Sequence, residues 1–356
     1  MTVVDVHAHV LSPELVRGPG QEEAWRPSVA YDHGRQVVEL RGQVVDSVVG
    51  ELSRIDVVLD ESRQMGVDHV LVSPWVAVLP DAVDPGLAGE VCSAQNESLA
   101  RVVRSHPGQV SALGAVTLRD AQAAAGQLEH AMASGLAGVE VAPSVDGTFL
   151  GDDRFLPFFE AAEALGALVF VHPASHGLGM SVFGEHYLWN SVANPVETAA
   201  AAARLVVSGV LERHPGLRIL LAHGGGVLPA VTGRLRRAHQ VRPEARARLS
   251  AGPEESLGRF LHDTVTHDRR LLRLLVELAG ADHVLLGSDR PFDMGTDCPV
   301  DEVRALGLAP EDEARVLGGN AAALLGLARD GGTGSSEAGL PAAEAPVAEA
   351  PAGGNP

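Results

Sequence analysis

Short apolar runs alternate with segments of helical periodicity along most of this chain. The runs are five to seven residues long and rich in valine and leucine, which is typical of buried parallel strands. They fall at 2–6, 67–73, 110–116, 136–142, 167–172, 217–223, 262–266 and 283–288. The helical segments fall at about 52–65, 90–105, 119–134, 155–166, 197–214, 227–239, 268–280 and 310–327. This alternation predicts an α/β fold, a (β/α)8 TIM barrel. The competing open sheet is disfavoured because no Gly-x-Gly-x-x-Gly turn follows the first strand.

Two of the predicted connections are long, at 11–50 after the first strand and 173–196 after the fifth. Both leave the C-terminal end of a strand, so we expect them to cover the face on which barrel enzymes build their active sites. Alternating residues at 36–41 predict a small β-ribbon within the first insertion. The segment 329–356 consists largely of Gly, Ser, Ala, Pro and Glu, a composition that predicts a disordered tail. We therefore expect one barrel domain over 1–328, with 11–50 as its cap.

Composition narrows the function classes. A net charge of −19 opposes binding to nucleic acid or to an anionic membrane. All 27 basic residues are arginine, which excludes Schiff-base lysine chemistry, a P-loop lysine and a metal pair bridged by a carbamylated lysine. No apolar run reaches the roughly 20 residues of a membrane span, and we expect a cytoplasmic protein. Cys92 and Cys298 lie in no Cys-x-x-Cys motif, so neither a disulfide framework nor a redox site is expected.

Polar side chains that can bind metal or carry protons stand at the ends of four predicted strands. His7 and His9 share one face of the first strand because alternate residues of a strand point the same way. Histidine also ends the fifth and sixth strands, and aspartate the eighth, at His172, His223 and Asp289. Polar residues in these positions are typical of an active site at the rim of a parallel barrel.

Four of these residues form the predicted metal site. Three imidazoles and one carboxylate, from His7, His9, His172 and Asp289, suit one divalent ion. Zn²⁺ is the expected ion, and Mn²⁺, Fe²⁺ and Co²⁺ suit the same ligands. Such an ion lowers the pKa of bound water towards ~7, and His223 is predicted to exchange protons beside it. A lone His-x-His pair is commonly two surface histidines, so the prediction depends on the four strand ends occurring together.

Five motifs give the chain a family resemblance. They are Val4-Asp5-Val6-His7-Ala8-His9, Val171-His172-Pro173, Ala222-His223-Gly224-Gly225-Gly226, Leu286-Gly287-Ser288-Asp289-Arg290-Pro291-Phe292 and Gly319-Asn320-Ala321-Ala322. Over about 2–328 the chain resembles the amidohydrolase superfamily, in particular the branch of aminocarboxymuconate-semialdehyde decarboxylase and related aromatic-acid decarboxylases. The resemblance implies the same four metal ligands, His223 as the catalytic acid–base with Asp289 beside it, and a homodimer.

The resemblance leaves the residues that contact substrate less defined. Arg290 stands where the family usually has tyrosine or tryptophan, and its guanidinium is predicted either to bind a substrate carboxylate or to pair with an acid outside the barrel. In the loop after strand one, Arg41 is a candidate, with Arg54 nearby, although an ungapped comparison puts Asp46 at the family's arginine position. Trp189 and Phe292 are the candidate walls of the substrate pocket. The candidate residues that orient the metal ligands are Glu140, Asp263 and His267.

These residues support one hypothesis and two alternatives. The hypothesis is cofactor-free, metal-dependent decarboxylation of a small unsaturated or aromatic carboxylic acid, with His223 and metal-bound water as the acid–base. The first alternative is hydrolysis of an amide, ester or lactone in the same site, which uses the same residues. The second is a catalytically silent barrel that serves as a binding protein, which requires a broken ligand set.

Overall fold

In the computed structural model, the described residues are 1–18, 23, 25–32, 35–40, 43–45, 52–173 and 178–327. The predicted disordered tail and Arg41 lie outside these residues. None of the helices described in the chain has the length and apolar character needed to cross a membrane.

The predicted TIM barrel is confirmed. Neighbouring barrel strands pair in parallel and in chain order, in two sheets that share the barrel wall. The barrel closes where the Val6 amide donates to the Leu286 carbonyl at 2.8 Å, and the sheets meet again where the Leu113 amide donates to the Val72 carbonyl at 2.9 Å. The strands are β1 Val4–Val10, β5 His69–Pro74, β6 Val110–Ala112, β7 Gly114–Ala115, β8 Gly138–Val141, β11 Leu168–Val171, β12 Arg218–Leu221, β13 Leu261–Asp263 and β14 Val284–Leu285. The third predicted strand is therefore split into β6 and β7.

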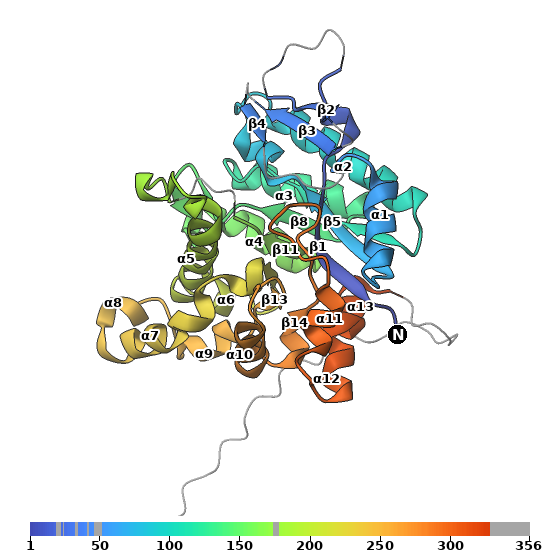
Figure 1. Ribbon diagram of the computed structural model, residues 1–356. Coiled ribbons are helices and arrows are strands. Elements are labelled where there is room, and N and C mark those ends of the chain that lie inside the picture. The colour runs from blue at the N-terminus through green and yellow to red at the C-terminus, as the bar shows by residue number, and fades with distance from the viewer. Residues whose placement is uncertain are drawn as a thin grey trace, which may run out of the picture.

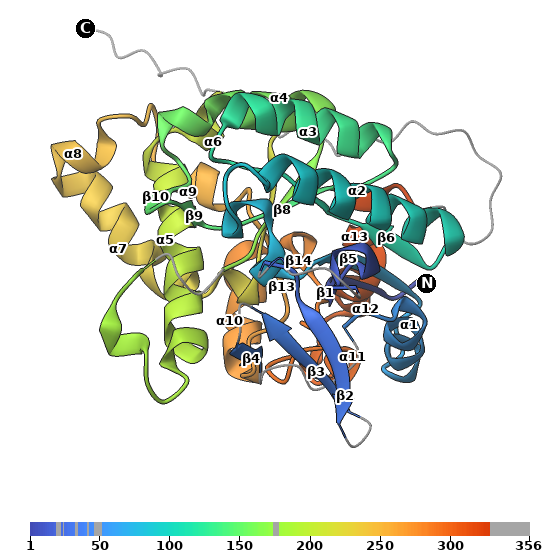
Figure 2. The ribbon, with the colours of Figure 1, turned by 90° about the horizontal axis from the view of Figure 1, so that it is seen from above.

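Helices surround the strands in both views (Figures 1 and 2). The longer ones are α1 Ile55–Gln64, α2 Ala88–Ser105, α3 Ala121–Ala133, α4 Leu156–Leu165, α5 Asn194–Val207, α7 Leu228–Val241 and α10 Arg269–Ala279. Shorter ones are α6 Val210–Arg213, α8 Pro243–Arg246, α9 Pro253–Leu257, α11 Pro299–Arg304, α12 Pro310–Ala314 and α13 Asn320–Leu325.

Two predicted helices are broken, each at a glycine. The predicted helix at 197–214 is divided into α5 and α6 by Gly209, whose φ of 73° is left-handed. The predicted helix at 310–327 is divided into α12, a π-helical turn and α13 around Gly318. There a side chain would meet the Thr2 carbonyl oxygen at 2.0 Å, so only glycine permits this approach to the start of the chain.

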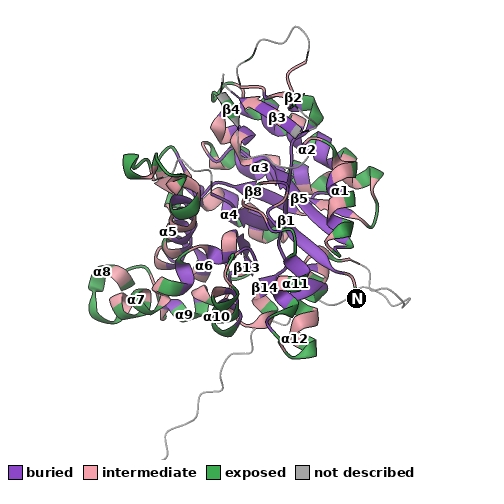
Figure 3. Ribbon diagram, viewed as in Figure 1, coloured by how far each residue is buried: buried purple, intermediate pink, exposed green. Residues whose placement is uncertain are grey.

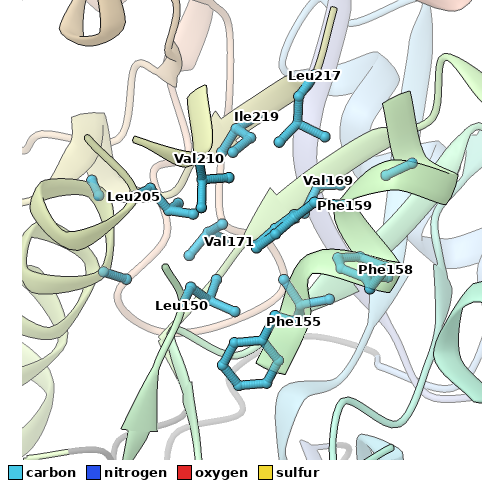
Figure 4. Packing of buried hydrophobic residues seen from close by; sticks show 14 of the residues in the cluster. Leu150, Phe155, Phe158, Phe159, Val169, Val171, Leu205, Val210, Leu217 and Ile219 are labelled. Atoms are coloured by element: carbon cyan, nitrogen blue, oxygen red, sulfur yellow. The ribbon is translucent and has the colours of Figure 1, made fainter. Parts of the chain in front are cut away.

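Alternation along the strands divides the core into two layers. On β11, Val169 and Val171 pack outwards against the helices, together with Phe155, Phe158 and Phe159 (Figure 4). Leu168 and Phe170, between them in sequence, belong to a separate cluster that includes Val4, Val6, Leu71, Leu113, Leu220 and Leu285. The strands are accordingly buried along their length, whereas the outer faces of the helices are exposed (Figure 3). His172 continues the alternation of Leu168 and Phe170 and so reaches the interior.

The insertion after β1 contains the predicted ribbon, enlarged to three antiparallel strands. These are β2 Ser28–Asp32, β3 Arg35–Leu40 and β4 Gln43–Val45, in the order β2-β3-β4. The ribbon extends from one end of the barrel (Figure 1). Its Val38 and Leu40 are in the buried cluster that contains Leu11 and Trp75, and Phe292 packs against the same cluster. The insertion is thereby joined to the barrel face from which the predicted site residues emerge.

Candidate metal centre

Three chain segments bring the four predicted ligands together at one end of the barrel. His7 and His9 lie within β1, His172 directly follows β11, and Asp289 lies four residues beyond β14. The two β1 histidines are 0% exposed, and His172 and Asp289 are each 5% exposed. Burial of this many ionisable groups is unfavourable unless they share a counter-charge or a metal ion. His223, which follows β12, joins the group at its more exposed side.

The ligand atoms converge on one point. One nitrogen from each of the three imidazoles and one Asp289 oxygen all lie within 4.8 Å of one another. His7 Nε2 is 3.1 Å from His9 Nε2, and each is 3.3 Å from Asp289 Oδ1. His172 Nε2 is buried and has no hydrogen-bond partner among the described residues. These separations suit ligands around a single ion bound at about 2.0–2.2 Å.

Hydrogen bonds at the far side of each imidazole direct its Nε2 towards this point. His9 Nδ1 lies 3.1 Å from the Pro74 carbonyl oxygen, and His172 Nδ1 lies 3.1 Å from the Pro173 carbonyl oxygen. A carbonyl only accepts, so both Nδ1 atoms carry the proton and both Nε2 atoms present a lone pair when the rings are neutral. The donor set therefore fits a divalent cation, with His7, His9, His172 and Asp289 as the residues that would hold it.

Asp263 connects the metal ligands to His223. Its Oδ2 accepts from His7 Nδ1 at 2.6 Å and from the His223 amide at 2.8 Å. Its Oδ1 accepts from the amides of Gly224 at 2.8 Å and Val265 at 3.0 Å. Burial alone raises the pKa of Asp263, but His7 and these donors hold it below its usual value. The predicted orienting residue is thus Asp263, whereas no hydrogen bond joins His267 to the ligand side chains in the described part of the chain.

A tight turn carries His223 over the site. His223 has φ 56° and lies within 3.3 Å of Asp289 through its Nε2 and the carboxylate Oδ2. Its Nδ1 is buried and has no hydrogen-bond partner in the described part of the chain. A side chain at Gly226, where φ is 62°, would meet the Pro195 carbonyl oxygen at 2.0 Å. Glycine is therefore required at position 226 because the backbone of α5 approaches it closely.

The electrostatics of the group call for a positive charge at its centre. Burial alone lowers the pKa of His7, but the carboxylates of Asp289 and Asp263 raise it to about 10. Burial likewise raises the pKa of Asp289, whereas His7 and the hydrogen bonds from the imidazoles hold it well below its usual range. Burial and the neighbouring imidazoles lower the pKa of His172 well below 6.5. The negative charge of the carboxylates thus favours a proton on His7, and a divalent cation bound between the ligands would compensate this charge in place of the proton.

Glu140 lies behind the ligands. Its Oε2 is 3.8 Å from His9 Nδ1, on the opposite side of the ring from the ligand atom, and it is not part of the converging group. Burial raises its pKa to about 7, although His9 opposes the shift. Glu140 thus lies behind His9 at more than hydrogen-bond distance, and its orienting role stays a prediction.

The proposed substrate contact of Arg290 requires a correction. Its Nη2 pairs with Glu61 of α1 at 2.8 Å and its Nη1 pairs with Asp297 at 2.8 Å. The guanidinium therefore forms ion pairs with two carboxylates of the chain, which was the second of the two roles predicted for Arg290. Its backbone carbonyl accepts from the His9 amide at 2.7 Å, so Arg290 ties the Asp289 loop to β1 and α1.

The two predicted aromatic walls take different positions. The Phe292 ring centroid is 5.1 Å from that of His9, beside the ligand group. Trp189 is farther along the loop after β11 and packs edge-to-face on Tyr187, with centroids 4.9 Å apart. Tyr187 in turn reaches Asp293, next to Phe292, with its hydroxyl 3.4 Å from Oδ1. Tyr187 and Asp293 were not among the residues predicted from the sequence. The only sequence feature that pointed to them is that they lie in the segments that follow the fifth and the eighth predicted strands.

Comparison with known proteins agrees with this geometry. A family model described as amidohydrolase matches residues 4–327. The chain belongs to the amidohydrolase family. This confirms the resemblance seen in the motifs around His7, His172, His223 and Asp289.

Relatives of this amidohydrolase are named as decarboxylases. The 2-amino-3-carboxymuconate-6-semialdehyde decarboxylase of Dictyostelium discoideum is 29% identical over 330 residues, which cover 91% of each chain. The 6-methylsalicylic acid decarboxylase of Penicillium expansum is 30% identical over 65% of this chain and 73% of its own length. A crystal structure of dihydroxybenzoic acid decarboxylase from Polaromonas sp. JS666, with bound manganese and the inhibitor 2-nitroresorcinol, superposes with a TM-score of 0.76 at 22% identity. It covers 92% of this chain and 98% of its own.

Proposed function

We propose that this amidohydrolase is a metal-dependent, non-oxidative decarboxylase of a small aromatic or unsaturated carboxylic acid. The observation that carries the proposal is the convergence of three imidazole nitrogens and one carboxylate oxygen within 4.8 Å, with His223 beside them. The names of the relatives support a carboxy-lyase over the hydrolase alternative. A silent barrel is disfavoured because no ligand position is broken.

We assign the metal site to His7, His9, His172 and Asp289, with Zn²⁺ as the proposed ion. Three nitrogens and one oxygen suit Zn²⁺, and Mn²⁺ is the principal competitor because it is bound in the structure of the Polaromonas enzyme. When bound, the ion supplies Lewis-acid binding for the substrate's carboxylate and a neighbouring oxygen. Elemental analysis of protein purified without added metal, followed by reloading with each ion, tests this assignment.

The chain's own residues define the proton transfer. His223 donates a proton to the substrate carbon that bears the carboxylate, while the bond between that carbon and the carboxylate breaks and carbon dioxide leaves. Asp289 Oδ2, 3.3 Å from His223 Nε2, holds the ring with this nitrogen towards the site. Asp263 fixes the backbone of the same turn through the His223 amide. Phe292 contributes an apolar wall against which a flat substrate packs.

Replacement of His223 tests the assignment of the proton donor. In His223→Ala and His223→Asn, metal content should persist while turnover falls by about 10²–10⁴-fold, the usual loss for an acid–base residue. Carbon dioxide release is measured against a panel of hydroxybenzoates, muconate semialdehydes and lactones. Activity that stays within about tenfold of the parent would show that another group supplies the proton. Cleavage of lactones in place of carbon dioxide release would favour hydrolysis.

We extend the proposal to a cytoplasmic homodimer whose partner is the small carboxylic acid alone. The family resemblance supports the dimer, and the charge of −19 argues against nucleic acid and anionic membranes as partners. Analytical ultracentrifugation of the metal-loaded protein tests the oligomeric state.

A further inference from the structure

A pocket lies on the outside of the barrel, between helices α7, α9 and α10 (Figure 1). Its volume is about 170 Å³, and the described residues that line it include none of the metal-ligand candidates. A cavity of about 150 Å³ with apolar walls holds one benzene ring, so this pocket has room for a ligand of that size. Its walls come mainly from apolar side chains of the three helices, namely Leu228, Pro229, Leu257, Leu275, Leu278 and Ala279.

His262 is the polar side chain that the barrel contributes to this pocket. Its neighbours on β13 face the barrel interior, because Leu261 packs against the inner cluster and Asp263 bonds to His7. Alternation along the strand therefore directs His262 outwards, to the layer of helices. His262 is only 4% exposed, so a ligand that reaches it leaves water behind.

The two nitrogens of His262 have different surroundings. Nδ1 lies 3.2 Å from the Gly224 carbonyl oxygen, which only accepts, so Nδ1 carries a proton. Burial lowers the pKa of His262 to about 4, so the ring is neutral near pH 7 and Nε2 presents a lone pair. Nε2 has no hydrogen-bond partner among the described residues. A side chain at Gly225 would lie 2.8 Å from Nδ1 and 3.0 Å from Cε1, so the turn covers that edge of the ring and leaves Nε2 towards the pocket.

We propose that this pocket is a second ligand site, which binds a small neutral phenol. The ring of the phenol packs between the leucines of the helices, and its hydroxyl donates to His262 Nε2. A carboxylate has no proton to donate at neutral pH, and its charge meets apolar walls that do not compensate it. A hydrocarbon of the same size fills the walls but leaves the buried nitrogen without a donor, which is unfavourable.

The pocket lies behind the turn that carries His223. The Gly224 carbonyl accepts from His262, and a side chain at Gly224 would lie 3.2 Å from Cδ2 of Leu275, which lines the pocket. A ring bound between Leu275 and His262 therefore presses on two groups that pack against this turn. We expect a bound phenol to lower kcat, because a small displacement of the proton donor slows turnover. This consequence rests on the proposed function, in which loss of carbon dioxide from a hydroxybenzoate also yields a phenol.

Fluorine NMR of two small ligands with the metal-loaded protein tests the site. 4-Fluorophenol should bind with a Kd of about 1 mM or below, and 4-fluorotoluene, with a methyl group in place of the hydroxyl, about threefold or more weakly. Leu278→Trp enlarges a side chain of the pocket wall and should remove the binding of 4-fluorophenol. Leu274→Trp is the matched control, because Leu274 is also an exposed leucine of α10 but does not line the pocket, and it should leave the binding unchanged.

Each result decides for or against the site. Binding of 4-fluorophenol that survives in Leu278→Trp, binding of 4-fluorotoluene that is as tight, or no binding at all overturns the proposal. Turnover is scored separately with a hydroxybenzoate: 4-fluorophenol should lower kcat, which competition at the metal centre leaves unchanged, in the parent and in Leu274→Trp but not in Leu278→Trp. An unchanged kcat at saturation refutes the link to the His223 turn. If the binding results hold and no acid is decarboxylated, the proposed function fails and the phenol site stands.

Discussion

Asp263 is the residue whose replacement should disturb the metal centre most without removing a ligand. Each of its oxygens accepts from two donors: His7 Nδ1 and the His223 amide at Oδ2, and the Gly224 and Val265 amides at Oδ1. In Asp263→Asn, an amide NH₂ must replace one oxygen. In either orientation of the asparagine amide, its NH₂ group faces two buried N–H donors that had bonded to a carboxylate oxygen, and both lose their acceptor.

The size of the effect follows from that count. A buried donor left without its acceptor costs about 1–3 kcal/mol, so two of them lower the free energy of unfolding by about 2–6 kcal/mol. His7 also loses the carboxylate that orients it, and loss of such a partner typically weakens metal binding by about 10–100-fold. Metal affinity is measured by competition with a chelator of known affinity, and unfolding by chemical denaturation of the metal-free protein.

The same substitution at Asp268 provides the control. Asp268 is the N-cap of α10, five residues along the chain, and accepts from the amides of Arg270 and Leu271. Asparagine also caps helices well, so Asp268→Asn should change the free energy of unfolding by less than about 1 kcal/mol and leave metal affinity unchanged. If Asp263→Asn binds metal within about twofold of the parent, Asp263 does not orient His7 and the reasoning is refuted.

Three further predictions follow from individual contacts. Arg290→Met should lower the free energy of unfolding by about 1–3 kcal/mol without altering the substrate KM, because the Arg290 guanidinium pairs with carboxylates of the protein. A tenfold rise in KM would instead show that Arg290 contacts the substrate. Iodoacetamide at pH 8 should modify exposed Cys298 but not Cys92 until the protein is denatured, as mass spectrometry would show, since burial raises the pKa of Cys92 to about 12. Burial alone raises the pKa of Glu163, but the Gly216 amide and His214 lower it, so its stabilisation is present above about pH 4.5 and lost as the pH falls. Glu163→Gln should therefore destabilise the protein by about 1 kcal/mol at pH 7, and denaturation curves should show this difference shrinking as the pH is lowered below about 4.5.

The barrel was predictable because its two signals are local. Valine- and leucine-rich runs and helical periodicity depend on nearest neighbours in sequence, and they place β5, β8, β11 and β12 close to their observed bounds, whereas β1 continues past the predicted 2–6 to Val10. The break at Gly318 was not predictable for the opposite reason. Gly318 interrupts its helix because the Thr2 backbone lies against it, and these two residues are distant in the sequence.

The ligand set was predictable for a different reason. A parallel barrel brings the C-terminal ends of all its strands to one face, so polar residues that end strands meet without any knowledge of packing. No comparable rule predicts where the end of a long, flexible side chain will lie. Arg290 follows Asp289 directly, yet its guanidinium lies between Glu61 and Asp297, and neither acid is marked by any pattern in the sequence.

The contrast between Arg290 and Asp263 explains how the site keeps its geometry. Asp289 and His223 both have left-handed backbones, at φ 59° and 56°, so neither position is favoured by its own conformation. Contacts from outside the ligand set hold them: the Arg290 carbonyl accepts from His9, and Asp263 accepts from the His223 amide. The first contact is made directly with β1, and the second is made with Asp263 of β13, which in turn accepts from His7 of β1. His223 is therefore joined to His7 of β1 through Asp263, and the Asp289 loop is joined to His9 of β1 through the Arg290 carbonyl, so a change that shifts β1 should alter metal binding and turnover together.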